Sequence, residues 1–373
     1  MAGVAGSYQQ VDGELVARMM SGCLAHRGPD DNGTYSFSDE RVSVHLTHRR
    51  LYVLDHAGGH QPFVKNGTAL AYDGKLYNSR ELRSELAASG ARFATSSDAE
   101  LVVEAWLRWG PGCLRKFRGM FAFAIFDERH GALFLARDHL GIKPMHYMCR
   151  KDGVVFASEL KALVAAFAGE IQIEPAGMVA ALLLGWVPDR RSAVFGPEKI
   201  EPGTWVEFRP DGSRRARRYF DAAEMAAAAN AGPPVDLIET LRESVAAELV
   251  GDVPISSLLS GGPGSGLVAV MAKQANPEVD AYTLAFPAEG RRGSSMGNGT
   301  TVARRLARRH SIELHEVRLA QDVASMVPAL AEVLDEPTGG PAALGTLVLC
   351  QVARRSGAKV LLSGLGGREL LGA

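Results

Sequence analysis

The sequence has few of the features that mark exported, membrane-spanning or nucleic-acid-binding proteins. Its four cysteines form no C-x-x-C pair, which argues against a zinc knuckle or a disulfide framework and favours a reduced, cytoplasmic setting. The N-terminus has no basic segment, and no apolar stretch approaches the ~20 residues of a membrane span. The 41 basic and 42 acidic residues nearly cancel, so we expect neither a nucleic acid nor a membrane as partner.

The first half of the chain is rich in short strands. Apolar or alternating runs separated by Gly, Asn or Asp predict strands at 42–46, 51–54, 68–72, 122–126, 132–136 and 154–157. Helical spacing predicts helices over 13–24 and 98–109, with Asp98 as the candidate N-cap of the second helix. Strands with a few interrupting helices indicate a layered α/β domain built on antiparallel sheets.

The chain changes character between residues 166 and 235, where prolines and an Ala-rich stretch accumulate. We therefore divide it into a first domain at 1–215, an Ala/Pro-rich linker at 216–235 and a second domain at 236–373. Two basic runs, 214–218 and 304–309, are interpreted as solvated faces.

The second half alternates strands with helices, which predicts a parallel sheet with covering helices. The predicted elements are helix 237–249, strand 254–259, helix 267–274, strand 281–286, helix 301–310, strand 313–319, helices 321–334 and 344–355, and strand 360–362. Glycine turns follow two of the strands, at 260–266 and 363–368. Each is either a phosphate-binding loop or a tight turn, and neither is a Walker A loop because no Lys follows the final glycine of the first.

Ordered motifs across nearly the whole chain make it similar to one enzyme family. The blocks are HRGPDD (26–31), HRRLYVLDHAGGHQPF (48–63), YDGKLYN (72–78), SSDAE (96–100), GMFAFAIFD (119–127), RDHLGIKP (137–144), ASELKAL (157–163), LLSGG (258–262), DEP (335–337) and LLSGLGGREL (361–370). The chain resembles asparagine synthetase of the glutamine-hydrolysing type. That resemblance implies an N-terminal class II glutamine amidotransferase domain of the N-terminal nucleophile hydrolase fold and a C-terminal ATP-pyrophosphatase-type domain, which we expect to be incomplete at its C-terminus.

The resemblance also implies that the glutaminase centre is altered. In the family the second residue is a cysteine whose thiolate attacks glutamine, with its own α-amine as the base. Here that position is Ala2, and Cys23 is no substitute on sequence grounds, because it lies on the predicted helix and is interpreted as a core residue. Asp73 stands at the family's oxyanion-hole amide, where a lost donor typically costs ~3 kcal/mol. Lys75 reverses the charge that should receive the substrate ammonium.

Part of the family's glutamine pocket is retained in the sequence. The resemblance implies that Arg50 binds the carboxylate of the substrate glutamine and that Asp98 binds its ammonium group. It also places Gly74 in the same pocket. We therefore expect a vestigial pocket that binds an amino acid weakly.

The synthetase half departs from the family in the same way. Gly264 replaces the Asp that places Mg²⁺ in the pyrophosphate loop, and Pro263 lacks an N–H. Leu365 and Arg368 stand where the family has two acids. The matching positions are vestigial nucleotide contacts: Leu259, Ser260, Gly261, Gly262, Ser265, Leu284, Ser363 and Gly364. We expect weak binding of ATP and Mg²⁺ at most, and no dedicated metal site.

The residues leave three functions open. The first is a pseudoenzyme, a non-catalytic homologue of asparagine synthetase. The second is an ATP-dependent ligase, like asparagine synthetase or β-lactam synthetase, that uses ammonia or an internal amine and has lost only the glutaminase. The third is a binding or assembly module, as a homo-oligomer or with an active homologue. The replacements at the nucleophile, oxyanion and metal positions favour the first.

Overall fold

The computed structural model describes residues 2–9, 11–53, 55, 58–229, 235–285, 296–318, 324–340 and 342–371. The chain divides into two compact units. The first comprises Met1–Gly232 together with Asp335–Gly339, and the second comprises Pro233–Leu334 together with Gly340–Ala373. Within the described residues, no helix has both the length and the apolar character that a membrane crossing requires.

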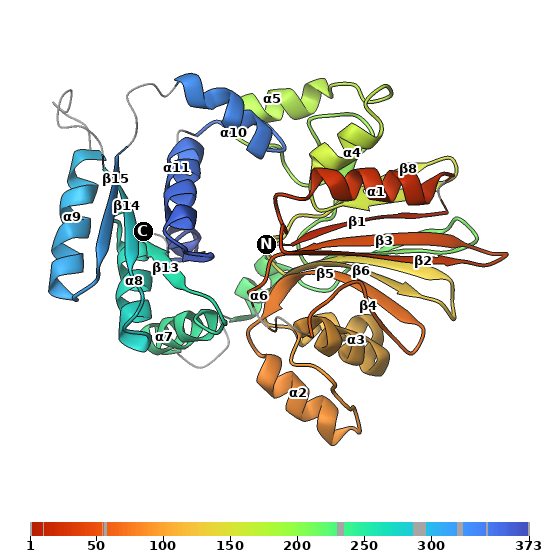
Figure 1. Ribbon diagram of the computed structural model, residues 1–373, viewed down its shortest axis with the longest axis horizontal. Helices are drawn as coiled ribbons and strands as arrows, with labels where there is room; N and C mark the ends of the chain where they lie inside the picture. The colour runs from red at the N-terminus through yellow and green to blue at the C-terminus, as the bar shows by residue number, and fades with distance from the viewer. Residues whose placement is uncertain are drawn as a thin grey trace. The chain divides into compact units, whose positions relative to one another are not determined.

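Two six-stranded antiparallel sheets form the centre of the first unit (Figure 1). One has the strand order β10-β8-β9-β1-β3-β2 and the other β12-β11-β7-β6-β5-β4. The strands of the first sheet are β1 (Gly3–Tyr8), β2 (Asp31–Ser38), β3 (Ser43–Arg50), β8 (His146–Arg150), β9 (Gly153–Ala157) and β10 (Glu198–Lys199). Those of the second are β4 (Phe63–Lys65), β5 (Thr68–Leu76), β6 (Gly119–Asp127), β7 (Ala132–Arg137), β11 (Thr204–Phe208) and β12 (Arg214–Arg218).

Helices cover the outer faces of this sandwich. Figure 1 shows α1 against the first sheet and α3 against the second, so the unit has four layers. The helical segments of the unit are α1 (Gly13–Cys23), α2 (Ser79–Ala88), α3 (Asp98–Trp109), η1 (Gly110–Arg115), α4 (Leu160–Ala166), α5 (Pro175–Leu184) and α6 (Ala222–Ala229).

Strand β6 shows why the sequence builds layers here. Successive side chains of a strand point to opposite faces of its sheet. Ala122, Ala124 and Phe126 lie in the core between the two sheets. Phe121 and Phe123 lie in the core beneath α2 and α3. Because both faces are buried, the strand is apolar throughout instead of alternating with polar residues.

The second unit contains a parallel sheet with the order β15-β14-β13-β16. Its strands are β13 (Ile255–Leu258), β14 (Ala281–Ala285), β15 (Leu314–Arg318) and β16 (Val360–Leu362). In Figure 1, α8 and α9 lie on one face of this sheet and α11 on the other. The helical segments are α7 (Leu237–Glu248), α8 (Pro263–Ala275), α9 (Met296–Arg309), η2 (Ala324–Met326), α10 (Val327–Val333), α11 (Ala342–Arg355) and α12 (Gly367–Leu371).

The fold class expected from the sequence is confirmed: antiparallel sheets in the N-terminal half and a parallel sheet in the C-terminal half. Some boundaries differ. Residues 51–53 are not a strand, and residue 54 lies outside the described residues. The helix predicted at 267–274 begins at Pro263, since proline suits the first helical position. The helix predicted over 321–334 is reduced to η2 and α10, and 321–323 lie outside the described residues.

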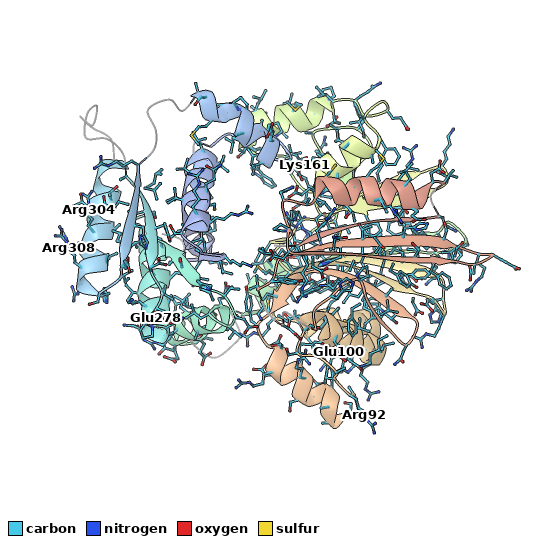
Figure 2. The ribbon with its side chains drawn as sticks, viewed as in Figure 1. Arg92, Glu100, Lys161, Glu278, Arg304 and Arg308 are labelled. Carbon is cyan, nitrogen blue, oxygen red and sulfur yellow. The ribbon has the colours of Figure 1, made fainter. Side chains whose placement is uncertain are left out.

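The arginines of the two basic runs are exposed, as interpreted from the sequence, while Leu306 and Ala307 of the second run pack into the core of the second unit. The first run is the edge strand β12, a role that its charge did not predict but that suits an edge, since charge discourages further strand pairing. Figure 2 shows Arg304 and Arg308 on the outer side of α9, and Arg304 pairs with Glu316 at 2.6 Å.

Candidate functional site

Residue 2 is fixed at the start of β1, a strand in the middle of its sheet. Its backbone nitrogen donates to Oδ1 of Asp73 at 2.9 Å, and its carbonyl oxygen accepts from Nε of Arg27 at 2.6 Å. Both polar groups of its backbone are therefore engaged. The side chain that Ala2 offers to this location is a methyl group, which has no nucleophilic atom.

Asp73 lies on β5, and its side chain is only 2% exposed. Its carboxylate pairs with Arg27 at 2.8 Å and with Lys143 at 3.1 Å, and both cationic side chains are less than one-tenth exposed. Burial by itself would raise the pKa of Asp73. Lys143, Arg27 and the N-terminus outweigh burial and hold the pKa well below the ordinary range for a carboxyl group. Asp73 is therefore a buried anion.

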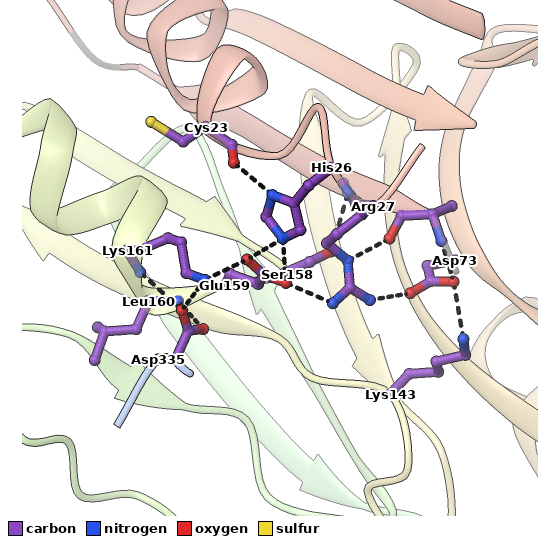
Figure 3. A network of polar contacts seen from close by, with 12 residues as sticks. Cys23, His26, Arg27, Asp73, Lys143, Ser158, Glu159, Leu160, Lys161 and Asp335 are labelled. Atoms are coloured by element: carbon purple, nitrogen blue, oxygen red, sulfur yellow. Dashed lines mark hydrogen bonds and ion pairs between the residues drawn. The ribbon is translucent and has the colours of Figure 1, made fainter. Parts of the chain in front are cut away.

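Glu159 continues this network on the other side of Arg27 (Figure 3). It pairs with Arg27 at 2.8 Å, with His26 at 3.0 Å and with Lys161 at 3.3 Å. Burial raises the pKa of Glu159, but Arg27 and the other cations bring it below its usual value. Positive and negative side chains therefore alternate along this network, in the order Lys143, Asp73, Arg27, Glu159 and Lys161.

Asp98 is the residue of the expected glutamine pocket with a free acceptor. Its Oδ2 accepts from the backbone of Leu76 at 2.9 Å, while its buried Oδ1 has no hydrogen-bond partner. The buried hydroxyl of Tyr72 likewise has none. Burial raises the pKa of Asp98, and Lys75 acts in the opposite direction. Asp98 is not the N-cap of α3, because Ser97 accepts the capping hydrogen bond from Glu100.

The other two residues of the expected glutamine pocket, Arg50 and Gly74, are in close contact with neighbouring groups of the chain. The buried guanidinium of Arg50 donates to the carbonyl of Asp55 and lies 4.7 Å from the ring centre of Tyr52. Gly3 of β1 pairs with Arg49 of β3, so Ala2 and Arg50 lie at the same end of the sheet. A Cβ atom on Gly74 would lie 2.6 Å from the backbone carbonyl oxygen of Met120 and 2.6 Å from the hydroxyl of Tyr72, so this position requires glycine.

In the second unit, the serine hydroxyl groups of the first glycine turn (residues 260–266) form hydrogen bonds within the turn itself. The Oγ atoms of Ser260 and Ser265 lie 2.9 Å apart, and Oγ of Ser265 also donates to the carbonyl of Gly262 at 3.1 Å. Gly261 has a φ of 86°, and a Cβ atom there would lie 2.1 Å from the carbonyl oxygen of Gly299. Only glycine fits this position.

The two glycine turns touch through their backbones. A Cβ atom on Gly364 would lie 2.3 Å from the backbone nitrogen of Ser265, and one on Gly264 would lie 3.0 Å from the carbonyl oxygen of Gly364. Leu365 is 87% exposed, and the side chain of Arg368 lies outside the described residues. The two turns follow neighbouring parallel strands, β13 and β16, at the same edge of the sheet, to which Leu259, Leu284 and Ser363 also belong.

A cavity of about 210 Å³ lies beside these turns, between α7, α8 and residues 362–370. Most residues that line it are apolar, Leu241, Leu267 and Met271 among them, and the charged side chain in the lining is Glu248. Across the described ranges, no group of three or more His, Cys, Asp or Glu residues is arranged to hold a metal ion.

Magnesium bound to ATP requires carboxylate and phosphate oxygens. Gly264 has no side-chain oxygen, and the hydroxyls of Ser260 and Ser265 bond to each other. Residues 258–266 therefore offer no side-chain carboxylate to such a metal–nucleotide pair.

Sequence reasoning missed the roles of Arg27, Lys143 and Glu159. Each lies in one of the quoted sequence blocks, but the partners are far apart in the chain: 46 positions separate Arg27 from Asp73, and 132 separate it from Glu159. A possible signal was the new acid at Asp73, because a buried carboxylate requires cationic partners.

Two family models match the chain. A glutamine amidotransferase domain matches residues 1–220, and an asparagine synthase domain matches residues 236–373. A solved structure of glutamine phosphoribosylpyrophosphate amidotransferase from B. subtilis aligns with 97% of this chain and 90% of that chain, at 16% identity and a TM-score of 0.46.

Curated relatives agree with the family models. Asparagine synthetase [glutamine-hydrolyzing] 1 of Bacillus subtilis is 31% identical over 98% of this chain and 56% of its own length. A putative asparagine synthetase [glutamine-hydrolyzing] of Mycobacterium tuberculosis is 33% identical over 100% of this chain and 58% of its own length. The chain thus spans a little over half the length of these relatives. The chain belongs to the asparagine synthetase family, with a glutamine amidotransferase domain followed by an asparagine synthase domain.

Proposed function

We propose that this chain is a non-catalytic member of the asparagine synthetase family that has lost glutamine hydrolysis. The observation that carries the proposal is the buried carboxylate of Asp73, held by Arg27, Lys143 and the backbone nitrogen of Ala2. By family resemblance this is where amide donors should stabilise an oxyanion. A fixed anion there destabilises the negative charge that develops in the transition state.

The same carboxylate also acts against the base of the family mechanism. If Met1 is removed, the nitrogen of Ala2 becomes an α-amine 2.9 Å from the Asp73 carboxylate. A neighbouring anion favours the protonated amine, which cannot accept a proton from a nucleophile. Restoring a thiol at position 2 alone therefore restores neither the base nor the oxyanion site.

Glutamate release from glutamine tests this reading. The wild-type chain and Ala2→Cys are expected to stay at the background of a protein-free control. Ala2→Cys/Asp73→Asn is expected to exceed Ala2→Cys at least tenfold, because removing one misplaced charge recovers part of a term typically worth ~10²–10³ in rate. Ala2→Cys/Asp39→Asn is the matched control, since Asp39 lies on an exposed turn. Glutamate release by the wild-type chain above background would contradict the proposal.

The proposal extends to the synthetase half. Gly264 and Leu365 have no side-chain oxygen that could bind a metal ion, and the neighbouring cavity is mostly apolar. A pyrophosphate-release assay with ATP, Mg²⁺, ammonia and a panel of carboxylates including aspartate is expected to show no turnover. Turnover with any carboxylate would instead support the alternative, a ligase that has lost only its glutaminase.

A retained binding function is favoured by two buried polar atoms that have no hydrogen-bond partner, Oδ1 of Asp98 and the hydroxyl of Tyr72. A ligand ammonium can donate to Oδ1 of Asp98, while Lys75 disfavours a second cation and weakens binding. Calorimetry with glutamine is expected to give weak binding that Asp98→Asn abolishes and Lys75→Ala strengthens. Equal heats for all three proteins would remove this second function.

A further inference from the structure

The segment Asp335–Gly339 belongs to the first unit although the chain on both sides of it belongs to the second. It forms neither helix nor strand. Its two acidic side chains are nevertheless largely covered, with 18% of Asp335 and 14% of Glu336 exposed. The contacts of these side chains, and not regular secondary structure, hold the segment to the first unit.

Asp335 bonds to the beginning of α4 (Figure 3). Its Oδ2 accepts from the backbone of Leu160 at 2.6 Å, its Oδ1 accepts from the backbone of Lys161 at 3.3 Å, and Nζ of Lys161 lies 3.5 Å away. The residue that precedes α4, Glu159, makes no capping bond, because its carboxylate pairs with Arg27. Asp335 therefore satisfies amides that the local sequence leaves without an acceptor.

Glu336 bonds to a second, separate part of the first unit. Its Oε1 accepts from the backbone of Ala193 at 3.0 Å, and its Oε2 pairs with Lys199, whose Nζ also donates to the carbonyl of Val187 at 2.7 Å. The side chain of Lys199 is 11% exposed. A partly buried charge pair of this kind is screened by salt much less than a surface pair.

We propose that the first unit carries an acceptor surface for an acidic peptide, and that Asp335–Gly339 occupies it as a detachable clip. The acceptor surface consists of the amides of Leu160 and Ala193 with the ammonium groups of Lys161 and Lys199. Two adjacent carboxylates, one on a short side chain and one on a longer side chain, match these two pairs of donors. A segment with this chemistry from another polypeptide fits the same surface.

Charge, and not apolar burial, holds this clip. The Asp335–Gly339 segment contributes two anions, a proline, a threonine and a glycine, and the backbone nitrogen of Gly339 donates to the carbonyl of Gly185 at 2.9 Å. Lys161 is shared between two carboxylates, because its Nζ lies near Asp335 and also 3.3 Å from Glu159. Reversing one charge is therefore expected to release the segment without disturbing a hydrophobic core.

Hydrogen exchange at the acceptor amides in the full chain tests the clip. Glu336→Lys and Lys199→Glu are each expected to accelerate exchange at Ala193 about tenfold or more, since a bond to a charged acceptor is lost. The double charge swap is expected to return exchange to within about threefold of wild type. Lys151→Glu, on the exposed turn between β8 and β9, is the matched control and should change nothing at Ala193.

A peptide tests whether the surface recognises the segment in trans. Asp335→Asn/Glu336→Gln vacates the acceptor surface, and a synthetic Val-Leu-Asp-Glu-Pro-Thr-Gly peptide is then expected to restore protection at Leu160 and Ala193. The same peptide with Asn-Gln in place of Asp-Glu should not. Wild-type exchange rates in the vacated variant would overturn the proposal. A folded vacated variant that the acidic peptide fails to protect would also overturn it. Neither outcome depends on whether the chain hydrolyses glutamine.

Discussion

At the scale of single residues, the decisive feature is how the negative charge of the buried Asp73 is balanced by cationic side chains. The sequence and the family resemblance singled out Ala2 and Asp73, and the structure places them in contact. The sequence could not predict that Arg27 and Lys143 converge on Asp73, because the cations come from distant parts of the chain. Nor could it predict that Ser97, and not Asp98, caps α3, since both residue types are common N-caps and only the extended backbone of Ser97 selects it.

Asp73→Asn is expected to destabilise the first unit by about 3 kcal/mol, because it leaves Lys143 without its buried partner. Chemical denaturation with two-state fitting of the first transition measures this. Asp39→Asn, which removes an equivalent charge from an exposed turn, should change stability by less than about 0.5 kcal/mol. An Asp73→Asn protein as stable as wild type would show that the cluster contributes no net stability.

Two buried histidines give the first unit a defined response to acid. Burial lowers the pKa of His48 from 6.5 to about 4 and that of His146 to about 3. Each is neutral when folded but binds a proton in the unfolded chain below pH 6.5. Stability is therefore present above pH 6.5 and is lost as the pH falls toward 4. His48→Gln should make the stability–pH curve shallower over this interval, by about one proton, and an unchanged slope would contradict the assignment.

At the scale of elements, apolar periodicity predicted α3 well, while strand bounds followed less closely. Leu101, Val102, Ala105 and Trp106 mark the buried stripe of α3, and the helix spans the predicted residues. The apolar run at 51–54 is not a strand over its described residues, because β3 ends at Arg50, whose guanidinium bonds to the following loop. β1 was missed, since its Gly, Ala and Ser residues carry little strand propensity and only burial between β9 and β3 selects it.

Ser97→Ala tests the observed cap of α3. It should cost about 1 kcal/mol of stability, because the hydroxyl accepts from the backbone of Glu100 at 3.3 Å and no other side chain there replaces it as the cap. Ser89→Ala, at the exposed end of α2, is the matched control with an expected cost of a few tenths of that. Thermal melts of both variants give the comparison. Equal shifts for the two variants would rule out Ser97 as the effective cap.

At the scale of the whole molecule, the order of predicted strands and helices distinguishes a half with antiparallel sheets from a half with a parallel sheet. It could not predict that Asp335–Gly339 would join the first unit, because this depends on ion pairs and backbone bonds that bridge up to 175 positions. The alternation of strands and helices in the sequence predicts only the order of the elements along the chain. The docking of Asp335–Gly339 on the first unit is decided by a few largely buried charged side chains that are distant in sequence.

Helix α5 carries apolar side chains to the surface of the first unit. Leu182 is 83% and Leu183 is 79% exposed. Val179 belongs to the same stripe of the helix, and Trp186, just beyond the helix end at Leu184, is also exposed. We expect the chain to self-associate through this stripe, as large exposed apolar patches commonly mark interaction sites. Leu183→Glu should lower the apparent mass in sedimentation velocity, whereas Leu140→Glu, at an exposed leucine outside α5, should not. A monomeric wild-type chain at high micromolar concentration would contradict this expectation.

Covalent trapping at the glutaminase centre tests the central claim most directly. After incubation with a glutamine-like diazoketone, intact-mass analysis of the wild-type chain should show no glutamine-protectable adduct. Ala2→Cys/Asp73→Asn should gain one adduct, mapped to residue 2. A protectable adduct on the wild-type chain, at Cys23 or any other residue, would show that a nucleophile operates in this pocket and would contradict the account.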